Sequence, residues 1–220
     1  MRRYILLALG TCLLVHVSQD SLAGPAPAAA PAPAAVPEEP LARAASNRVK
    51  LWHKAGTGAH LTARYQMTRR SSLLFEPLST QGSLRFTAPA TLELRDEDPT
   101  GATTSVTGGA LTIVANDPAL PVGPTLGDGS PVRRWLRDHL LALLGARDLV
   151  ALRAEARLRP VFGLRTAFEL SPAPGHPARA AVHDLAIQLD PDSGELVRLV
   201  ITETGGDVVT LTLSEHVRTP

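Results

Sequence analysis

The sequence predicts an α+β protein that is mainly β, built of short antiparallel strands and interrupted by a helical segment. Apolar and polar residues alternate over residues 61–68, 82–88 and 91–95, which is the period of a strand with one buried face. Proline and glycine bound these segments, as is typical of a meander of short strands. Between Pro131 and Arg147 the period changes from two to nearly four, which indicates an amphipathic helix inserted between two sets of strands.

The first 23 residues have the features of a cleaved secretory signal. Arg2 and Arg3 precede an apolar run over residues 4–17, and Ser21-Leu22-Ala23 offers a small-x-small cleavage site. The run is shorter than the roughly 20 apolar residues that span a bilayer. We therefore expect cleavage before Gly24 and export to the periplasm.

Residues 24–42 are rich in alanine and proline, which predicts an extended linker, and residues 43–220 have the size of one domain. Removing residues 1–23 leaves 20 basic residues, 20 acidic residues and no cysteine. A nearly neutral domain without a basic stripe does not fit a nucleic-acid-binding protein. Without cysteine, stability must come from an ordinary apolar core instead of disulfides.

The remaining elements follow from the same two periods and from turn residues. A first helix is expected over residues 43–56, ended by glycines. Ser130 as N-cap, Pro131 in the first turn and Gly145 near the end delimit the inserted helix. A second short helix is expected over residues 148–157. Further strands are expected over residues 103–106, 110–114, 164–170, 182–189, 196–203 and 208–214, with hairpin turns at residues 190–194 and 204–207.

Known catalytic and metal-binding motifs are missing from the sequence. There is no HExxH helix, nucleophile elbow or phosphate-binding loop. Asp190, Asp192 and Gly194 resemble the start of a calcium loop, but Ile201 stands where the loop needs Glu, so a turn is the better interpretation. Residues 96–98, Asp-Glu-Asp, are interpreted as a solvated bend. We expect no enzymatic activity, no metal and no other cofactor, and a hydrolase with an unrecognised site is the last of three hypotheses.

The order of the segments, and the prolines and glycines that separate them, resemble those of the LolA-like outer-membrane lipoprotein carriers. Residues 63–66, Ala-Arg-Tyr-Gln, are similar to the first strand of that family, and residues 82–89 match its Gly-x-Leu-x-Phe-x-x-Pro strand. Leu92, Leu94 and Pro99 follow as in its next strand. Residues 187–196 and 200–211 fit its closing hairpins. The resemblance covers the chain from about Asn47 to Ser214.

The resemblance implies an unclosed antiparallel β-barrel, a half-barrel whose concave apolar face is covered by a helical lid. In this family that face holds acyl chains of lipoproteins in transit to the outer membrane. A soluble carrier needs such a surface, because exposed hydrocarbon costs about 0.8 kcal/mol per CH2. The residues expected to line the lipid-binding cavity share one face of neighbouring strands and of the inserted helix: Tyr65, Leu84, Phe86, Leu92, Leu94, Trp135, Leu136 and Leu140.

The implied partners are lipoprotein or other acylated cargo, an inner-membrane release complex and an outer-membrane acceptor, with the carrier itself a monomer. The family carries an Arg before the strand-ending proline that helps to hold the lid closed, whereas this chain has Ala88 before Pro89. That departure favours other cargo, such as a glycolipid or a polyene lipid. A periplasmic lipid-binding or sensor module of the same fold is the other alternative. The apolar positions also fit a plain packed core, since alternation alone does not separate a core from a cavity lining.

Overall fold

The computed structural model describes residues 60–73, 75–117, 119, 131–145, 155–161 and 166–220. These residues form a sheet of ten strands with one α-helix and one short 3-10 helix. The strands are β1 (His60–Arg70), β2 (Leu78–Thr87), β3 (Thr91–Asp96), β4 (Ala102–Thr107), β5 (Ala110–Ala115), β6 (Ala156–Pro160), β7 (Ala167–Pro172), β8 (Val182–Leu189), β9 (Leu196–Glu203) and β10 (Val208–Thr219). The helices are α3 (Pro131–Gly145) and η3 (Pro177–Ala180).

The sheet consists of two antiparallel meanders joined by the first and last strands. Its order is β5-β4-β3-β2-β1-β10-β9-β8-β7-β6, and every neighbouring pair is antiparallel. β1 and β10 pair from His60↔Thr219 to Arg70↔Val208. The strands β5 and β6 end the order and do not pair with each other, so the sheet is open. The predicted α+β, mainly β, half-barrel class is therefore confirmed.

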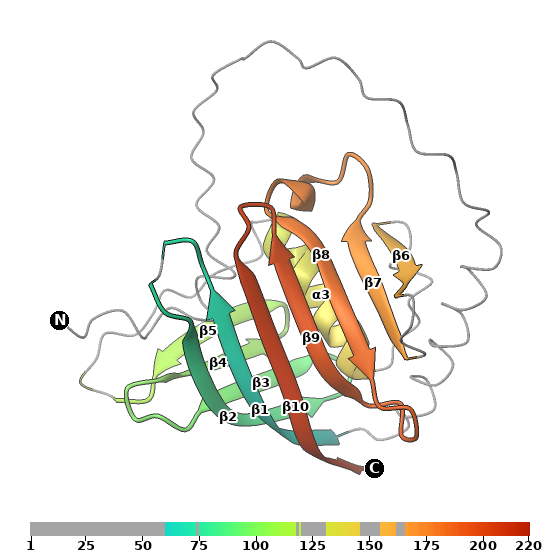
Figure 1. Cartoon of the computed structure of the whole chain (residues 1–220). Coiled ribbons are helices and arrows are strands. Elements are labelled where there is room, and N and C mark those ends of the chain that lie inside the picture. Colours follow the sequence, from blue (N-terminus) through green and yellow to red (C-terminus); the bar gives the residue numbers. More distant parts are fainter. Residues whose placement is uncertain (1–59, 74, 118, 120–130, 146–154, 162–165) are drawn as a thin grey trace, which may run out of the picture.

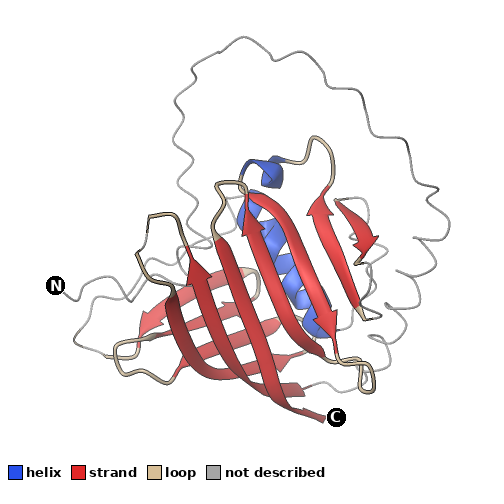
Figure 2. Ribbon diagram, in the orientation of Figure 1, coloured by secondary structure: helices blue, strands red, loops and turns tan. Residues whose placement is uncertain are grey.

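One face of the curved sheet is buried and α3 lies against it (Figure 1). Burial alternates along β1, where Leu61, Ala63, Tyr65 and Met67 are buried and the residues between them face outward. The same alternation recurs in β8. Figure 2 shows α3 on the inner side of the curve, behind β8 and β9. The sheet and the helix thus form two layers around one apolar core.

The inserted helix forms because its apolar residues recur at helical spacing. Val132, Trp135, Leu136 and Leu143 are buried together, so they place one stripe of α3 against the sheet. Pro131 occupies the first turn, where its missing N–H costs no intrahelical bond. The helix ends at Gly145 and confirms the predicted segment, whereas the predicted N-cap Ser130 lies outside the described residues.

The second predicted helix, over residues 148–157, is wrong at its end. Ala156 and Arg157 begin the strand β6, which the sequence did not predict. Alanine, leucine, arginine and glutamate favour helices, but pairing with β7 from Ala156↔Pro172 to Pro160↔Phe168 overrides that preference. Residues 148–154 lie outside the described residues, as do the first predicted helix, the signal segment and the linker.

Several strand boundaries differ from the predicted ones. β8 and β9 begin and end as predicted. β7 continues two residues past the predicted end, to Pro172, and β2 already begins at Leu78. β10 extends beyond the predicted Ser214 to Thr219. That extension matters because it places Arg218 within the sheet.

Gly82 is required by close approach between neighbouring strands. It pairs with Tyr65 on one side and Asp96 on the other. A Cβ at this position would lie 2.0 Å from the carbonyl oxygen of Arg95 and 2.9 Å from Cε1 of Tyr65. The glycine of the Gly-x-Leu-x-Phe segment is thus required by the close approach of β2 to β3.

We expect Gly82→Ala to lower the free energy of unfolding by about 2–3 kcal/mol, because the backbone of β3 must move to admit the methyl group. Urea unfolding followed by circular dichroism measures this loss. Gly205→Ala is the matched control, since a Cβ at Gly205 would meet nothing within 4 Å. Equal stability of the two variants would contradict the assigned β2–β3 register.

Candidate functional site

The predicted site residues on the strands lie side by side on the concave face. Leu84 pairs with Leu94 and Phe86 pairs with Leu92 across β2 and β3. Tyr65 lies on β1, next to β2. Each of these five side chains is at most 3% exposed. The strands therefore present one continuous apolar surface.

The predicted residues on the helix complete the same cluster. Trp135 and Leu136 are buried, and Leu140 is half-buried and packs against the cluster. All eight predicted residues thus come together between the sheet and α3. Among the described residues, their side chains pack against one another in a single apolar cluster.

Tyr65 places a polar hydroxyl at the edge of this apolar face. Its hydroxyl donates a hydrogen bond to the Asp96 carboxylate at the end of β3. Burial raises the pKa of Tyr65 well above its usual value, and the hydrogen bond to Asp96 raises that pKa further. The phenol therefore stays protonated and remains a hydrogen-bond donor. Asp96 also accepts from the backbone N–H of Ala102, which fixes the turn into β4.

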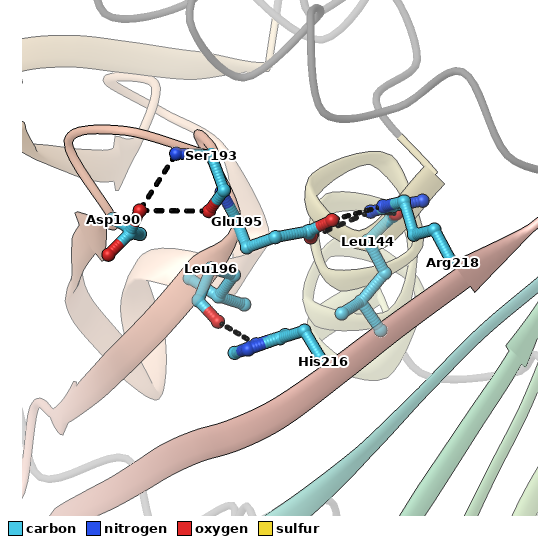
Figure 3. A network of polar contacts seen from close by, with 7 residues as sticks. All are labelled: Leu144, Asp190, Ser193, Glu195, Leu196, His216 and Arg218. Carbon is cyan, nitrogen blue, oxygen red and sulfur yellow. Dashed lines mark hydrogen bonds and ion pairs between the residues drawn. The ribbon is translucent and has the colours of Figure 1, made fainter.

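The C-terminal end of α3 contacts a partly buried ion pair that the sequence did not predict. Arg218 Nη2 donates to the Leu144 carbonyl at 3.0 Å and to Glu195 Oε2 at 3.0 Å. Figure 3 shows Arg218 reaching from β10 toward both groups. The last carbonyls of a helix have no intrahelical partner, so a cation placed there satisfies one of them and complements the helix dipole. We call this contact of Arg218, Glu195 and Leu144 the helix latch.

The neighbouring turn holds Glu195 in position. Asp190 Oδ1 accepts from the backbone N–H and the hydroxyl of Ser193, at 2.8 and 2.9 Å. These hydrogen bonds lower the pKa of Asp190 below its usual value. His216 Nε2 donates to the Leu196 carbonyl at 2.8 Å, because a carbonyl only accepts (Figure 3). β10 is thus bonded by side chains to the β8–β9 turn region from which Glu195 projects.

Two further bonds attach α3 to the sheet at its other turns. Trp135 Nε1 donates to the Glu155 carbonyl at 3.0 Å, just before β6. Arg137 Nη1 donates to the Gly109 carbonyl at 2.8 Å in the β4–β5 turn. The helix is therefore connected to both edges of the open sheet as well as to β10.

A buried histidine lies within the apolar stripe of α3. His139 is fully buried, its Nδ1 donates to the Trp135 carbonyl at 2.7 Å, and its ring lies 4.1 Å from the Trp135 ring. Burial lowers the pKa of His139 below its usual value, so the ring is neutral and packs as part of the core.

The described residues do not assemble a metal site. Among them, no group of three histidine, cysteine, aspartate or glutamate side chains could hold a metal ion. The acids of residues 96–98 have other partners, since Glu97 pairs with Arg64 and hydrogen bonds from Thr100 lower the pKa of Asp98. Hydrogen bonds from Ser193 to Asp190 show that residues 190–194 form a turn, as predicted. Within the described ranges, no helix is long and apolar enough to cross a membrane.

The chain is similar in fold to several solved structures at low identity. A DUF1329 family protein from Desulfovibrio piger has a TM-score of 0.45 and 8% identity, covering 80% of this chain and 92% of that one. A LolA superfamily protein from Nitrosomonas europaea has a TM-score of 0.43 and 8% identity, covering 80% and 93%. The Mycobacterium tuberculosis lipoprotein LppX has a TM-score of 0.39 and 15% identity, covering 79% and 95%.

A LolA superfamily protein is thus among the structures that this chain is similar to. The chain matches no protein-family model, and no curated protein is similar to it in sequence. At such TM-scores and identities the likeness identifies no ligand and no partner.

The pKa of Tyr65 predicts how stability depends on pH. The unfolded phenol ionises near pH 10, whereas the folded phenol keeps its proton. The unfolded state then binds fewer protons, so stability falls by up to about 1.4 kcal/mol per unit as pH rises above 10. Tyr65→Phe should remove this loss. Urea unfolding of both proteins from pH 8 to 11.5 checks it, and parallel curves would contradict the raised pKa.

Removing the helix latch should loosen the end of α3. We expect Arg218→Ala to lower the free energy of unfolding by about 2 kcal/mol, because Glu195 and the Leu144 carbonyl both lose their donor. Backbone amides in the last turn of α3 should then exchange faster in hydrogen–deuterium exchange. Arg198→Ala, an exposed change on β9, is the control. Unchanged exchange in α3 would show that the latch does not hold the helix.

Proposed function

We propose that this protein is a periplasmic carrier that binds acyl chains of lipoproteins, or of a related lipid, between its concave sheet and α3, for transfer towards the outer membrane. The observation that supports the proposal most is the composition of the interface. One apolar cluster spans β1–β4, β6–β10 and the whole length of α3, and side-chain hydrogen bonds of Trp135, Arg137 and Arg218 join the helix to the rest of the described structure. The helix can therefore move away from the sheet without breaking backbone hydrogen bonds between strands.

Energetics favour an exchange of the helix for the ligand. Moving α3 away exposes apolar side chains to water, and an acyl chain that enters covers them again at about 0.8 kcal/mol per CH2. The ligand therefore replaces the contacts that α3 makes with the sheet. The net binding free energy is the difference between burying the apolar face under the ligand and burying it under α3. Binding of this kind is substantial yet reversible, which a carrier needs in order to release its cargo.

The helix latch offers a reason why the chain lacks the family's Arg before Pro89. Ala88 is exposed at the end of β2 and makes no polar side-chain contact with α3. Arg218 supplies a cation to α3 from β10 instead. We propose that this hydrogen bond must break before α3 moves away from the sheet, so that Arg218 stabilises the closed state without ligand.

The proposal describes a binding protein without enzymatic activity or cofactor. Its cargo is acylated protein or lipid, and its partners are a donor complex in the inner membrane and an acceptor in the outer membrane. The second candidate is a lipid-binding sensor module of the same fold, and a glycolipid or polyene lipid is the alternative cargo. Organic extraction of native periplasmic protein followed by lipid analysis separates these. Bound acyl species support the carrier, and their absence favours the sensor.

Trp135 allows a direct test of where acyl chains bind. The chain has two tryptophans, so Trp52→Phe leaves Trp135 as the single fluorophore, buried between α3 and the sheet. Dibromostearic acid quenches tryptophan only on contact. We expect it to quench Trp135 at saturation, while stearic acid changes the intensity little and raises the melting temperature by stabilising the bound state.

The same titration can contradict the proposal in two ways. A rise in melting temperature without quenching would place the acyl site away from the concave face. Neither quenching nor a thermal shift would argue against acyl binding altogether. Leu140→Gln serves as a matched variant, since Leu140 is half-buried at the rim of the cluster. It should weaken binding without the large loss of stability that a fully buried polar group causes.

A further inference from the structure

A cationic hollow lies on the outer face of the sheet, opposite the apolar face. It has a volume of about 260 Å³ and is lined by residues of β6, β7, β8, η3 and the β9–β10 turn. Arg157 and Arg159 alternate with the buried Ala156 and the half-buried Leu158 along β6. Arg179 comes from η3. Three guanidinium groups from two separate segments therefore face one hollow.

The segment that carries Arg179 is tied to the rim of the hollow. The Thr204 hydroxyl donates to the Arg179 carbonyl at 3.0 Å, and the Thr204 N–H donates to the Ala181 carbonyl at 2.8 Å. β6 is held in register with β7, where Arg157 lies opposite Ser171 and Arg159 opposite Glu169. The arginine backbones thus sit on fixed elements on both sides.

The arginines of the hollow differ from those that are paired with a carboxylate. Arg64, Arg69 and Arg218 each form an ion pair with a carboxylate. For Arg157, Arg159 and Arg179, no carboxylate in the described ranges lies within ion-pair distance.

Two acids line the hollow beside the three arginines. Asp184 already contacts His183 and accepts from the Thr202 hydroxyl at 3.2 Å. Glu169 is the other acid. Glu169 lies opposite Arg159 in the β6–β7 register, so three guanidinium groups stand against two carboxylates and the hollow keeps a net positive charge.

We propose that this hollow binds a phosphate group, either as free phosphate or as the headgroup of a phospholipid. The planar guanidinium fork donates two parallel hydrogen bonds to phosphate oxygens. Three such groups around an open hollow can contact several oxygens of one tetrahedral anion. This inference goes beyond acyl binding and does not depend on it, because the two sites lie on opposite faces of the sheet.

The test compares wild type with the double variant Arg157→Ala/Arg179→Ala and the control Arg198→Ala, an exposed arginine on β9 outside the hollow. Inorganic phosphate is titrated at low ionic strength while NMR follows the arginine Nε–H signals. We expect the double variant to bind at least about tenfold more weakly and the control to bind as wild type does. Because all three arginines are exposed, we expect both variants to fold as wild type does, which circular dichroism checks.

Dihexanoyl phosphatidic acid, kept below its critical micelle concentration, distinguishes the two sources of phosphate. Binding about tenfold tighter than that of inorganic phosphate indicates a lipid headgroup, and equal binding indicates free phosphate. The proposal is overturned if wild type binds neither probe more tightly than the double variant does. It is also overturned if Arg198→Ala weakens binding as much, because that would indicate diffuse attraction. Quenching of Trp135 by dibromostearic acid should be the same in all three proteins, so failure of this site leaves the acyl site testable.

Discussion

The pairing of β1 with β10 is the interaction on which the rest of the structure depends. It joins two meanders that are otherwise separate, from β1 to β5 and from β6 to β10, into one sheet. Contacts between the first and last described strands are distant in sequence and costly in chain entropy, but they put both meanders on one curved surface. The same strand, β10, then carries Arg218 to the end of α3.

The open sheet creates a problem that α3 solves. A curved sheet with one apolar face and two free edges must bury that face against another layer. The helix α3 covers that face with Trp135, Leu136 and the leucines of its last two turns. Its hydrogen bonds to the sheet include those made through Trp135, Arg137 and Arg218. A cover attached in this way is well buried and is still a separate layer from the sheet, which is the physical basis for proposing reversible binding beneath it.

Polar groups gather at the margins of the apolar interior. Tyr65 and Asp96 close one end of the β1–β3 surface, and Glu195 and Arg218 close another. Arg157, Arg159 and Arg179 line a hollow on the outer face, on the other side of the sheet. The two faces therefore offer different chemistry, apolar burial on the inner face and cationic hydrogen bonding on the outer one.

The sequence by itself determined the strands, the inserted helix and the apolar face, because alternation and helical spacing are local patterns that burial enforces. It also placed the eight predicted cavity residues on common faces of the strands and the helix, and these residues belong to one cluster in the structure. Tertiary structure decided the rest. β6 formed against helix-favouring residues because β7 offered it a partner. The helix latch joins Leu144, Glu195 and Arg218, which no local period connects, since long-range polar contacts depend on the register of β10 and the packing of α3 together.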